Sequence, residues 1–363
     1  MKEIPKLKIG NIEVDIPIIQ GGMSVGISLS NLASAVAREG GIGVIGGAAI
    51  GMLESDFERN FREANKRALK REIRRAREKS NGKGAIGLNL LVAQSDFDEL
   101  FLTAIEDEVD LIFMGAGLPL KLPLPADKLK RVHTGFVPIV SSPRAAKLIF
   151  KYWANNYKRV PDAVVVEGPL AGGHLGFKKD QIFKSEYQLE KILPQVVAVI
   201  KEYEIAFNKK IPVIAAGGIY TGEDIKKFLE LGASGVQMGT RFVATYECNA
   251  APEFKEAYIK AKKEDIIIIE SPVGLPGRAI KNKFLEEAAQ GKKKPKKCTW
   301  KCLKPCDFRK VPYCIALALT NAKRGKLKEG FVFAGANAYR INKIISVKTL
   351  IEELLEGYLK AGG

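Results

Sequence analysis

A short apolar run followed by a segment of helical periodicity recurs eight times between residues 16 and 263. The runs are nearly continuous in Val, Ile and Leu, which is typical of parallel strands covered on both faces. Eight such units over about 250 residues predict an α/β fold of the (β/α)8 TIM-barrel type. The expected strands cover residues 16–23, 42–46, 85–91, 110–115, 136–142, 162–168, 211–218 and 235–243.

A doubly wound open sheet is the alternative arrangement of these units. In such a sheet, polar and glycine-rich segments gather at one switch point. In this chain they recur at the C-terminal ends of many strands, where a barrel carries its active site. The barrel is therefore favoured.

The pattern changes after Lys263. A strand and loop are expected over residues 265–282, a helix over 315–325, an apolar strand and turn over 331–340, and a final helix over 346–359. We therefore predict a barrel over residues 1–263 and a C-terminal α+β appendage, packed on it, over residues 264–363.

The chain has a formal net charge of +17, from 58 Lys plus Arg against 41 Asp plus Glu. Much of the excess lies in residues 61–84, where acidic residues are interspersed, and in residues 292–297. The first segment is typical of the solvated face of a long helix. Because few aromatic side chains that could stack on bases accompany its charges, we expect no nucleic-acid partner. The basic surface can still attract anionic substrates.

No apolar run approaches the ~20 residues of a membrane span, and no secretory leader is recognisable. We therefore expect a cytoplasmic protein without a membrane partner. The odd cysteine count of five agrees with a reducing compartment. The sequence leaves open whether the chain forms a homo-oligomer.

Four cysteines lie within one short segment: Cys298, Cys302, Cys306 and Cys314. Their spacing, C-x3-C-x3-C-x7-C, matches neither a zinc ribbon nor a ferredoxin. Four neighbouring thiols could nevertheless ligate an iron-sulfur cluster or zinc. The alternative is a set of reduced, buried structural cysteines.

Two glycine motifs follow the seventh and eighth strands, "AAGGI" at residues 215–219 and "QMGTRF" at residues 237–242. In a barrel, the loops after these strands commonly bind phosphate through exposed backbone N–H groups. Thr221 is expected to cap the seventh helix, with Asp224 three residues on. If the glycines serve only tight turns, no phosphate site is implied.

Asn89 interrupts an otherwise apolar strand, "GLNLL". A buried amide is costly without a hydrogen-bond partner. The polar edge of a flat cofactor ring would supply one, and so would nearby backbone.

His174 is one of only two histidines and stands in "VEGPLAGGHLGF", at the end of the sixth expected strand. An imidazole that titrates near neutral pH can remove an acidic proton from a substrate carbon or, when protonated, hold an anion. A purely structural histidine is the alternative. His133, at the head of the fifth strand, is expected to be structural.

Taken in order, "IPIIQGGM", "GLNLL", "VEGPLAGGHLGF", "PVIAAGGI" and "QMGTRF" resemble the nitronate monooxygenases, which are FMN-dependent (β/α)8 barrels. The flavin-type enoyl-acyl-carrier-protein reductases share these motifs. The resemblance implies that His174 is the active-site histidine. It also implies FMN contacts through Gly22, Met23, Asn89, Glu167, Gly172, Gly218, Gln237, Met238, Gly239 and Thr240.

The resemblance implies oxidation of alkyl nitronates with O2 to carbonyl compounds and nitrite, so the partners would be a small-molecule substrate and O2. An NAD(P)H-dependent enoyl-acyl-carrier-protein reductase is the second hypothesis, and a flavin-storing barrel without catalysis is the third. The family often has an acidic residue where this chain has Leu170, and this departure bears on substrate identity. The turn at residues 333–340 could lend Asn337 or Tyr339 to the substrate pocket, or could be a surface turn.

Overall fold

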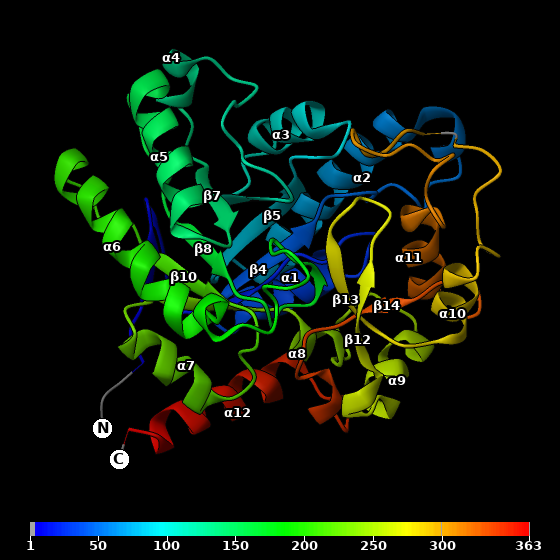
Figure 1. The fold of residues 1–363 in the computed structure, drawn as a ribbon. Helices are drawn as coiled ribbons and strands as arrows, with labels where there is room; N and C mark the ends of the chain where they lie inside the picture. The colour runs from blue at the N-terminus through cyan, green and yellow to red at the C-terminus, as the bar shows by residue number, and fades with distance from the viewer. Residues whose placement is uncertain (1–3, 299, 363) are drawn as a thin grey trace.

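The computed structural model describes residues 4–298 and 300–362, and its centre is a closed barrel of eight parallel strands (Figure 1). The ring closes because β10 pairs with β11 on one side and with β8 on the other. The TIM-barrel prediction is therefore confirmed and the open sheet is wrong. The barrel strands are β3 (Ile18–Gln20), β4 (Ile42–Gly46), β5 (Ala85–Leu91), β6 (Leu111–Gly115), β7 (Gly135–Val140), β8 (Val164–Glu167), β10 (Val213–Ala216) and β11 (Gly235–Met238).

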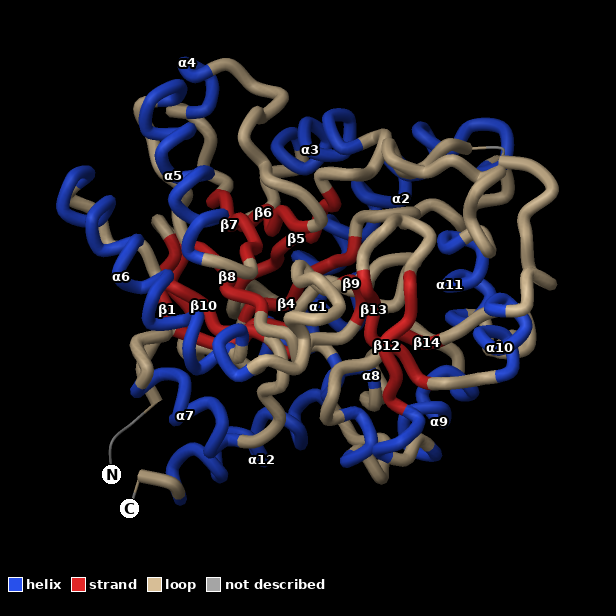
Figure 2. Tube along the Cα trace, in the orientation of Figure 1, coloured by secondary structure: helices blue, strands red, loops and turns tan. Residues whose placement is uncertain are grey.

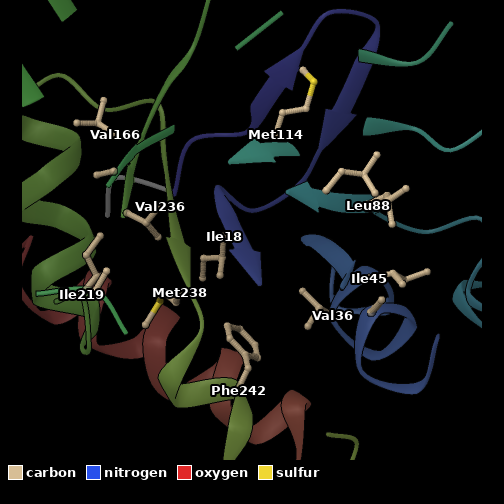
Figure 3. Close-up of a cluster of buried hydrophobic side chains, with 14 of the residues drawn as sticks. Ile18, Val36, Ile45, Leu88, Met114, Val166, Ile219, Val236, Met238 and Phe242 are labelled. Atoms are coloured by element: carbon tan, nitrogen blue, oxygen red, sulfur yellow. The ribbon is translucent and has the colours of Figure 1, made fainter. Parts of the chain in front are cut away.

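Alternate side chains of the strands point to opposite sides of the barrel wall, which explains why the strands are apolar throughout. Ile19, Val44 and Phe113 belong to the cluster that fills the inside. Ile18, Ile45 and Leu88 belong to the larger cluster between the strands and the helices, part of which is drawn in Figure 3.

An N-terminal hairpin closes one end of the barrel. It consists of β1 (Leu7–Ile9) and β2 (Ile12–Val14), and its apolar side chains join the interior cluster. Our sequence interpretation did not include this hairpin, because strands of three residues carry too little periodicity to be recognised.

The expected helices surround the barrel. Their N-termini follow ordinary capping chemistry: Ser142 caps α5 ahead of Pro143, and Thr221 forms the predicted capping box with Asp224 at α7. The helices of this layer are α1 (Ser30–Arg38), α2 (Phe57–Ser80), α3 (Phe97–Glu106), α4 (Ala126–Leu129), α5 (Pro143–Tyr157), α6 (Leu189–Phe207), α7 (Gly222–Glu230) and α12 (Val347–Lys360), which contacts both α7 and α1. The helix expected after the eighth strand, α9 (Pro252–Lys260), lies elsewhere: it contacts the turn at residues 338–340, and its Phe254 and Tyr258 line the cavity at the end of the barrel.

The eighth strand is shorter than expected. Instead of reaching Val243, β11 ends at Met238, and residues Thr240–Val243 form the short helix α8. Gly239 begins this helix with a backbone conformation outside the β region (φ −114°, ψ −57°). In the sequence, the apolar residues Phe242 and Val243 continue the pattern of the strand. In the structure they belong to helix α8, and their side chains are buried.

The C-terminal segment forms a small sheet beside the barrel strands (Figure 2). β12 (Ile266–Glu270) and β13 (Pro276–Ile280) form an antiparallel hairpin, and β13 also pairs with β14 (Val332–Phe333). On the edge of β13 that faces away from β12, β14 pairs with the end of the strand, and β9 (Gly173–His174), which follows barrel strand β8, pairs nearer its start. The remaining helices of this segment are α10 (Lys283–Ala289), α11 (Ile315–Lys323) and α12 (Val347–Lys360).

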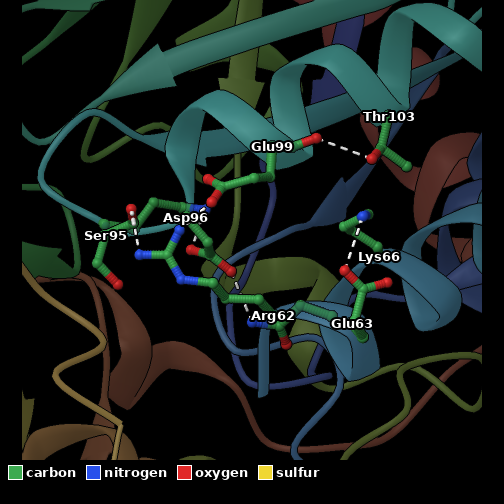
Figure 4. Close-up of polar contacts among 9 residues, drawn as sticks. Arg62, Glu63, Lys66, Ser95, Asp96, Glu99 and Thr103 are labelled. Carbon is green, nitrogen blue, oxygen red and sulfur yellow. Dashed lines mark hydrogen bonds and ion pairs between the residues drawn. The ribbon is translucent and has the colours of Figure 1, made fainter. Parts of the chain in front are cut away.

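The basic residues of α2 are largely paired within the molecule. Arg62 forms an ion pair with Glu99 of α3 and also reaches the carbonyl of Ser95, as Figure 4 shows. Further along α2, Arg74 pairs with Asp107 at 2.8 Å. These contacts agree with the expected solvated helix face.

Among the described residues, no helix combines the length and the apolar character that crossing a bilayer requires.

Candidate active site

A cavity of about 770 Å³ lies at the C-terminal ends of the barrel strands. This is the end at which barrel enzymes place their catalytic residues. Loops of the barrel form one wall, and the C-terminal segment forms the other. Every site residue named from the motifs lines it: Gly22, Met23, Asn89, Glu167, Gly172, His174, Gly218, Gln237, Met238, Gly239 and Thr240.

Glycines on the barrel wall allow close packing. A Cβ atom on Gly22 would lie 2.4 Å from the Cβ of Asn89, and one on Gly172 would lie 2.6 Å from the carbonyl carbon of Ala334. Gly218 has a φ of +86°, which side chains rarely adopt. In contrast, a Cβ on Gly239 would meet nothing within 4 Å, so this position faces open space.

Several polar side chains of the cavity have no protein partner. Among the described residues, the side chains of Asn89, Glu167 and Gln237 make no hydrogen bond, yet none of their polar atoms is sealed from the cavity. Buried polar groups are normally paired. A flat ligand with donors and acceptors on its edge would pair these groups, so the residues present fit a flavin ring.

Glu167 stands at the end of β8. Burial raises the pKa of its carboxyl to about 7, because the charged form is poorly solvated there. This carboxyl therefore changes its protonation state near neutral pH.

His174 lies between the two walls. Its Nε2 is 2.6 Å from Oγ of Ser271, and its ring meets the edge of Phe333 with centroids 5.1 Å apart. Burial lowers the pKa of His174 to about 4, because the imidazolium ion loses solvation. The ring is therefore neutral at physiological pH, and the expected role of a protonated imidazole as anion holder does not fit this environment.

The loop before His174 is held by the C-terminal segment. Arg278 of β13 donates from Nη2 to the carbonyl of Pro169 at 2.6 Å and from Nε to the carbonyl of Ala171 at 3.2 Å. Burial lowers the pKa of Arg278 to about 10. Gly173 then turns the chain with a φ of +81° and pairs with Arg278 in the β9–β13 ladder.

The turn at residues 333–340 also contacts the barrel wall. Asn337 Nδ2 donates to the carbonyl of Gly218 at 2.6 Å, and the N–H of Gly335 donates to Oγ1 of Thr240 at 3.0 Å. Asn337 lines the cavity, whereas Tyr339 is absent from its lining. His133 is exposed and lies outside the cavity, as expected for a residue without a role there.

Sequence reasoning missed Ser271, Arg278 and Phe333, although they surround His174. We expected a strand and loop over residues 265–282, whereas the turn "SPVG" at residues 271–274 is a signal that could have predicted the hairpin. Nothing in the sequence indicated that this hairpin would reach a residue about a hundred positions earlier.

The cysteine segment does not support the expected iron-sulfur or zinc site. Within residues 4–298 and 300–362, no three or more His, Cys, Asp or Glu side chains are arranged to hold a metal ion. Cys298 is exposed, whereas Cys302 packs with Cys314 beside Met52 and Phe57. Burial raises the pKa of Cys302 to about 12 and also raises the pKa values of Cys306 and Cys314, and the neighbouring thiols of this segment are a smaller cause in the same direction.

Comparison with known proteins identifies the family and the fold. The sequence model of the family described as nitronate monooxygenase matches residues 6–357. A probable nitronate monooxygenase of Staphylococcus aureus strain JH9 is 27% identical over 303 residues, or 77% of this chain and 79% of the relative, and that of strain N315 matches equally.

Solved structures give the same fold. FabK from Thermotoga maritima superposes with a TM-score of 0.74 at 27% identity, covering 96% of this chain and 94% of that one. A nitroalkane oxidase from Streptomyces ansochromogenes, at 23% identity and a TM-score of 0.71, covers 96% of this chain and 97% of its own and shares the fold. The extent of the family match shows that this chain belongs to the nitronate monooxygenase family of oxidoreductases.

Proposed function

We propose that this protein is an FMN-dependent nitronate monooxygenase, which oxidises alkyl nitronates with O2 to carbonyl compounds and nitrite. One observation carries the proposal. The cavity that gathers all the motif residues also contains His174, the histidine that the family resemblance assigns to the active site.

The barrel wall would hold the cofactor. Asn89, Glu167 and Gln237 would pair with polar atoms of the flavin, and the open space at Gly239 next to Thr240 would receive the phosphate end. When bound there, FMN supplies redox chemistry that no side chain of the cavity can provide.

Other residues of the cavity would surround the substrate. His174 is an uncharged hydrogen-bonding group beside the apolar side chains of Leu170, Leu175 and Phe333. Such surroundings exclude water and strengthen a hydrogen bond to a nitronate oxygen. Because Leu170 stands where relatives often carry an acid, the substrate end lacks that negative charge, which favours an anionic substrate.

A second function is an enoyl-acyl-carrier-protein reductase that uses NAD(P)H. The structural similarity to FabK of Thermotoga maritima supports it. Against it, the described residues that line the cavity include no lysine or arginine to bind the phosphates of a dinucleotide. A small nitronate needs no such cation, and we therefore favour the monooxygenase.

The experiment is a comparison of two reactions on the FMN-loaded protein. We expect aerobic mixing with propyl nitronate to release nitrite, and anaerobic NADH or NADPH to leave the visible flavin band unchanged. Rapid bleaching by NADH, with reduction of a crotonyl thioester and no nitrite, would establish the reductase instead. Turnover of neither substrate, with no effect of replacing His174, would favour a flavin-storing barrel.

A further inference from the structure

We propose that Ser271 is a positioning residue that fixes His174 as the tautomer with its proton on Nδ1, so that the neutral ring donates a hydrogen bond into the cavity. The assignment of the acceptor as a nitronate oxygen rests on the proposed function. The tautomer itself rests on the geometry alone.

The turn between β12 and β13 holds Ser271 firmly. Its N–H donates to the carbonyl of Leu275 at 3.1 Å, and its carbonyl accepts from the N–H of Gly274 at 2.9 Å. The residue is only 7% exposed. Its hydroxyl therefore has a defined position against the imidazole.

The hydroxyl has two polar contacts among the described residues. The N–H of Val273 donates to Oγ at 3.4 Å, which occupies an acceptor site of the oxygen. His174 Nε2, at 2.6 Å, is the other contact and can accept. A serine hydroxyl has one proton to donate. A protonated Nε2 would donate to the second lone pair of Oγ and leave the hydroxyl proton without an acceptor among the described residues. An unprotonated Nε2 accepts that proton, so both groups are paired, and we assign this arrangement.

An imidazole nitrogen that accepts a hydrogen bond carries no proton, so in the neutral ring the proton lies on Nδ1. Nδ1 makes no hydrogen bond to a described residue, and it is not among the sealed polar atoms that lack a partner. Since the ring lines the cavity, Nδ1–H is available to a ligand.

The chemical consequence concerns the role of His174. A ring whose Nδ1 carries the proton and whose Nε2 faces Ser271 has no free nitrogen for proton abstraction. It can donate to a negatively charged oxygen without carrying a charge of its own. The assignment therefore makes His174 a neutral electrophilic donor rather than a base.

The test is the tautomeric state of His174 in ¹⁵N-histidine-labelled, FMN-loaded protein at neutral pH. The chain has only two histidines, so His174→Gln assigns both pairs of signals and exposed His133 serves as the internal reference. We expect a protonated Nδ1 and an unprotonated Nε2 for His174. In Ser271→Ala, the population should move toward Nε2–H, and Ser271→Thr, which keeps the hydroxyl, should restore the original state.

A protonated Nε2 in the wild-type protein would overturn the proposal, and so would a Nδ1–H state that persists unchanged in Ser271→Ala. The wild-type spectrum alone can overturn it, so the outcome does not depend on the variant folding. The measurement involves no turnover. If the expected tautomer is found but nitronate is not oxidised, the proposed function fails and the tautomer assignment stands.

A kinetic readout completes the test. We expect Ser271→Ala to lower kcat/KM for propyl nitronate by about tenfold, the scale of one lost hydrogen bond, and Ser271→Thr to recover most of it. Ser80→Ala is the matched control, because it also removes a buried hydroxyl, one that donates to the carbonyl of Arg77 at the end of α2. An unchanged kcat/KM in Ser271→Ala would contradict the positioning role.

Discussion

The two walls of the cavity are built in different ways. The barrel wall consists of strand ends and glycine turns, with polar side chains such as Asn89 that form no hydrogen bond to a described residue. The wall from the C-terminal segment consists of side chains that bond to the barrel, including Ser271 on His174, Arg278 on the loop at Pro169, and Asn337 on Gly218. Under the proposed function, the first wall would receive the cofactor, whereas the second would order the residues that face the substrate.

This difference separates binding from reaction. Changes in the barrel wall should remove the flavin, and changes in the C-terminal wall should lower turnover while the flavin stays bound.

The largest effect is expected from Gly22→Ala. A Cβ atom there would lie 2.4 Å from that of Asn89, so the strand end must shift and the polar edge of the flavin site is lost. We expect the purified variant to contain almost no FMN, measured by the visible flavin absorbance per chain.

Gly239→Ala is the matched control, because its new methyl group meets no protein atom within 4 Å. The thermal stability of its apoprotein should equal that of the wild type, while its FMN affinity falls. Full flavin content in Gly22→Ala would contradict the role given to the barrel wall.

His174→Gln should have the next largest effect. Unlike Gly22→Ala, it should lower turnover while FMN stays bound. We expect it to keep one FMN per chain and to lower kcat/KM for nitronate by about 100-fold, the lower range for loss of a catalytic hydrogen-bond donor. Steady-state nitrite release with flavin absorbance on the same sample measures both quantities. His133→Gln, on the exposed histidine, should change neither.

Arg278→Leu tests the order that the C-terminal wall imposes on the loop before His174. Two buried carbonyls lose their donors, so we expect the free energy of unfolding to fall by about 1 to 3 kcal/mol and kcat/KM to fall with it. Urea unfolding and nitrite release check the two effects. Arg309→Leu is the control, because Arg309 is exposed and its one ion-pair partner within the described part of the chain is the neighbouring Asp307. Equal stability losses in both variants would argue against the role of Arg278.

The smallest effects concern pH. The pKa of Glu167 is raised in the folded protein, so its contribution to stability is complete below pH 4.5 and is lost as the pH rises through about 7. The pKa of His174 is lowered, so its contribution is complete above pH 6.5 and is lost as the pH falls toward about 4. For each group, the free energy of unfolding changes by at most about 1.4 kcal/mol per pH unit.

Between pH 4.5 and 6.5, rising pH lowers the stability contribution of Glu167 and raises that of His174 in the apoprotein. Relative to wild type, Glu167→Gln should therefore gain stability with rising pH, and His174→Gln should lose stability with rising pH. Chemical denaturation across this window measures both differences. Parallel curves for wild type and variants would show that neither group has a shifted pKa.

The two walls also differ in how well they could be predicted from the sequence. The barrel wall was predictable because each strand is an apolar run and because the glycines at residues 217–218 and 239 interrupt the pattern at strand ends. These glycines, Asn89 and His174 accordingly stood out as interruptions at strand ends. The barrel topology placed them at one end of the barrel, whereas their assignment to a flavin site came from the family resemblance.

The C-terminal wall was not predictable because its contacts join residues far apart in the chain. β9 has two residues and is a strand because it pairs with β13, so no local sequence pattern predicts it. Arg278 reads as an ordinary charged residue in a short strand, and only the tertiary fold buries it against two carbonyls. The boundary at residues 263/264 remains a prediction, since contacts of this kind cross it.

The most direct test of the account is the number of FMN molecules bound per chain, titrated in parallel on the apo forms of the wild type, Gly22→Ala and His174→Gln. The account predicts saturable binding of one FMN to the wild type and to His174→Gln, and almost none to Gly22→Ala. No saturable binding to the wild type, or loss of FMN from His174→Gln as complete as from Gly22→Ala, would contradict it.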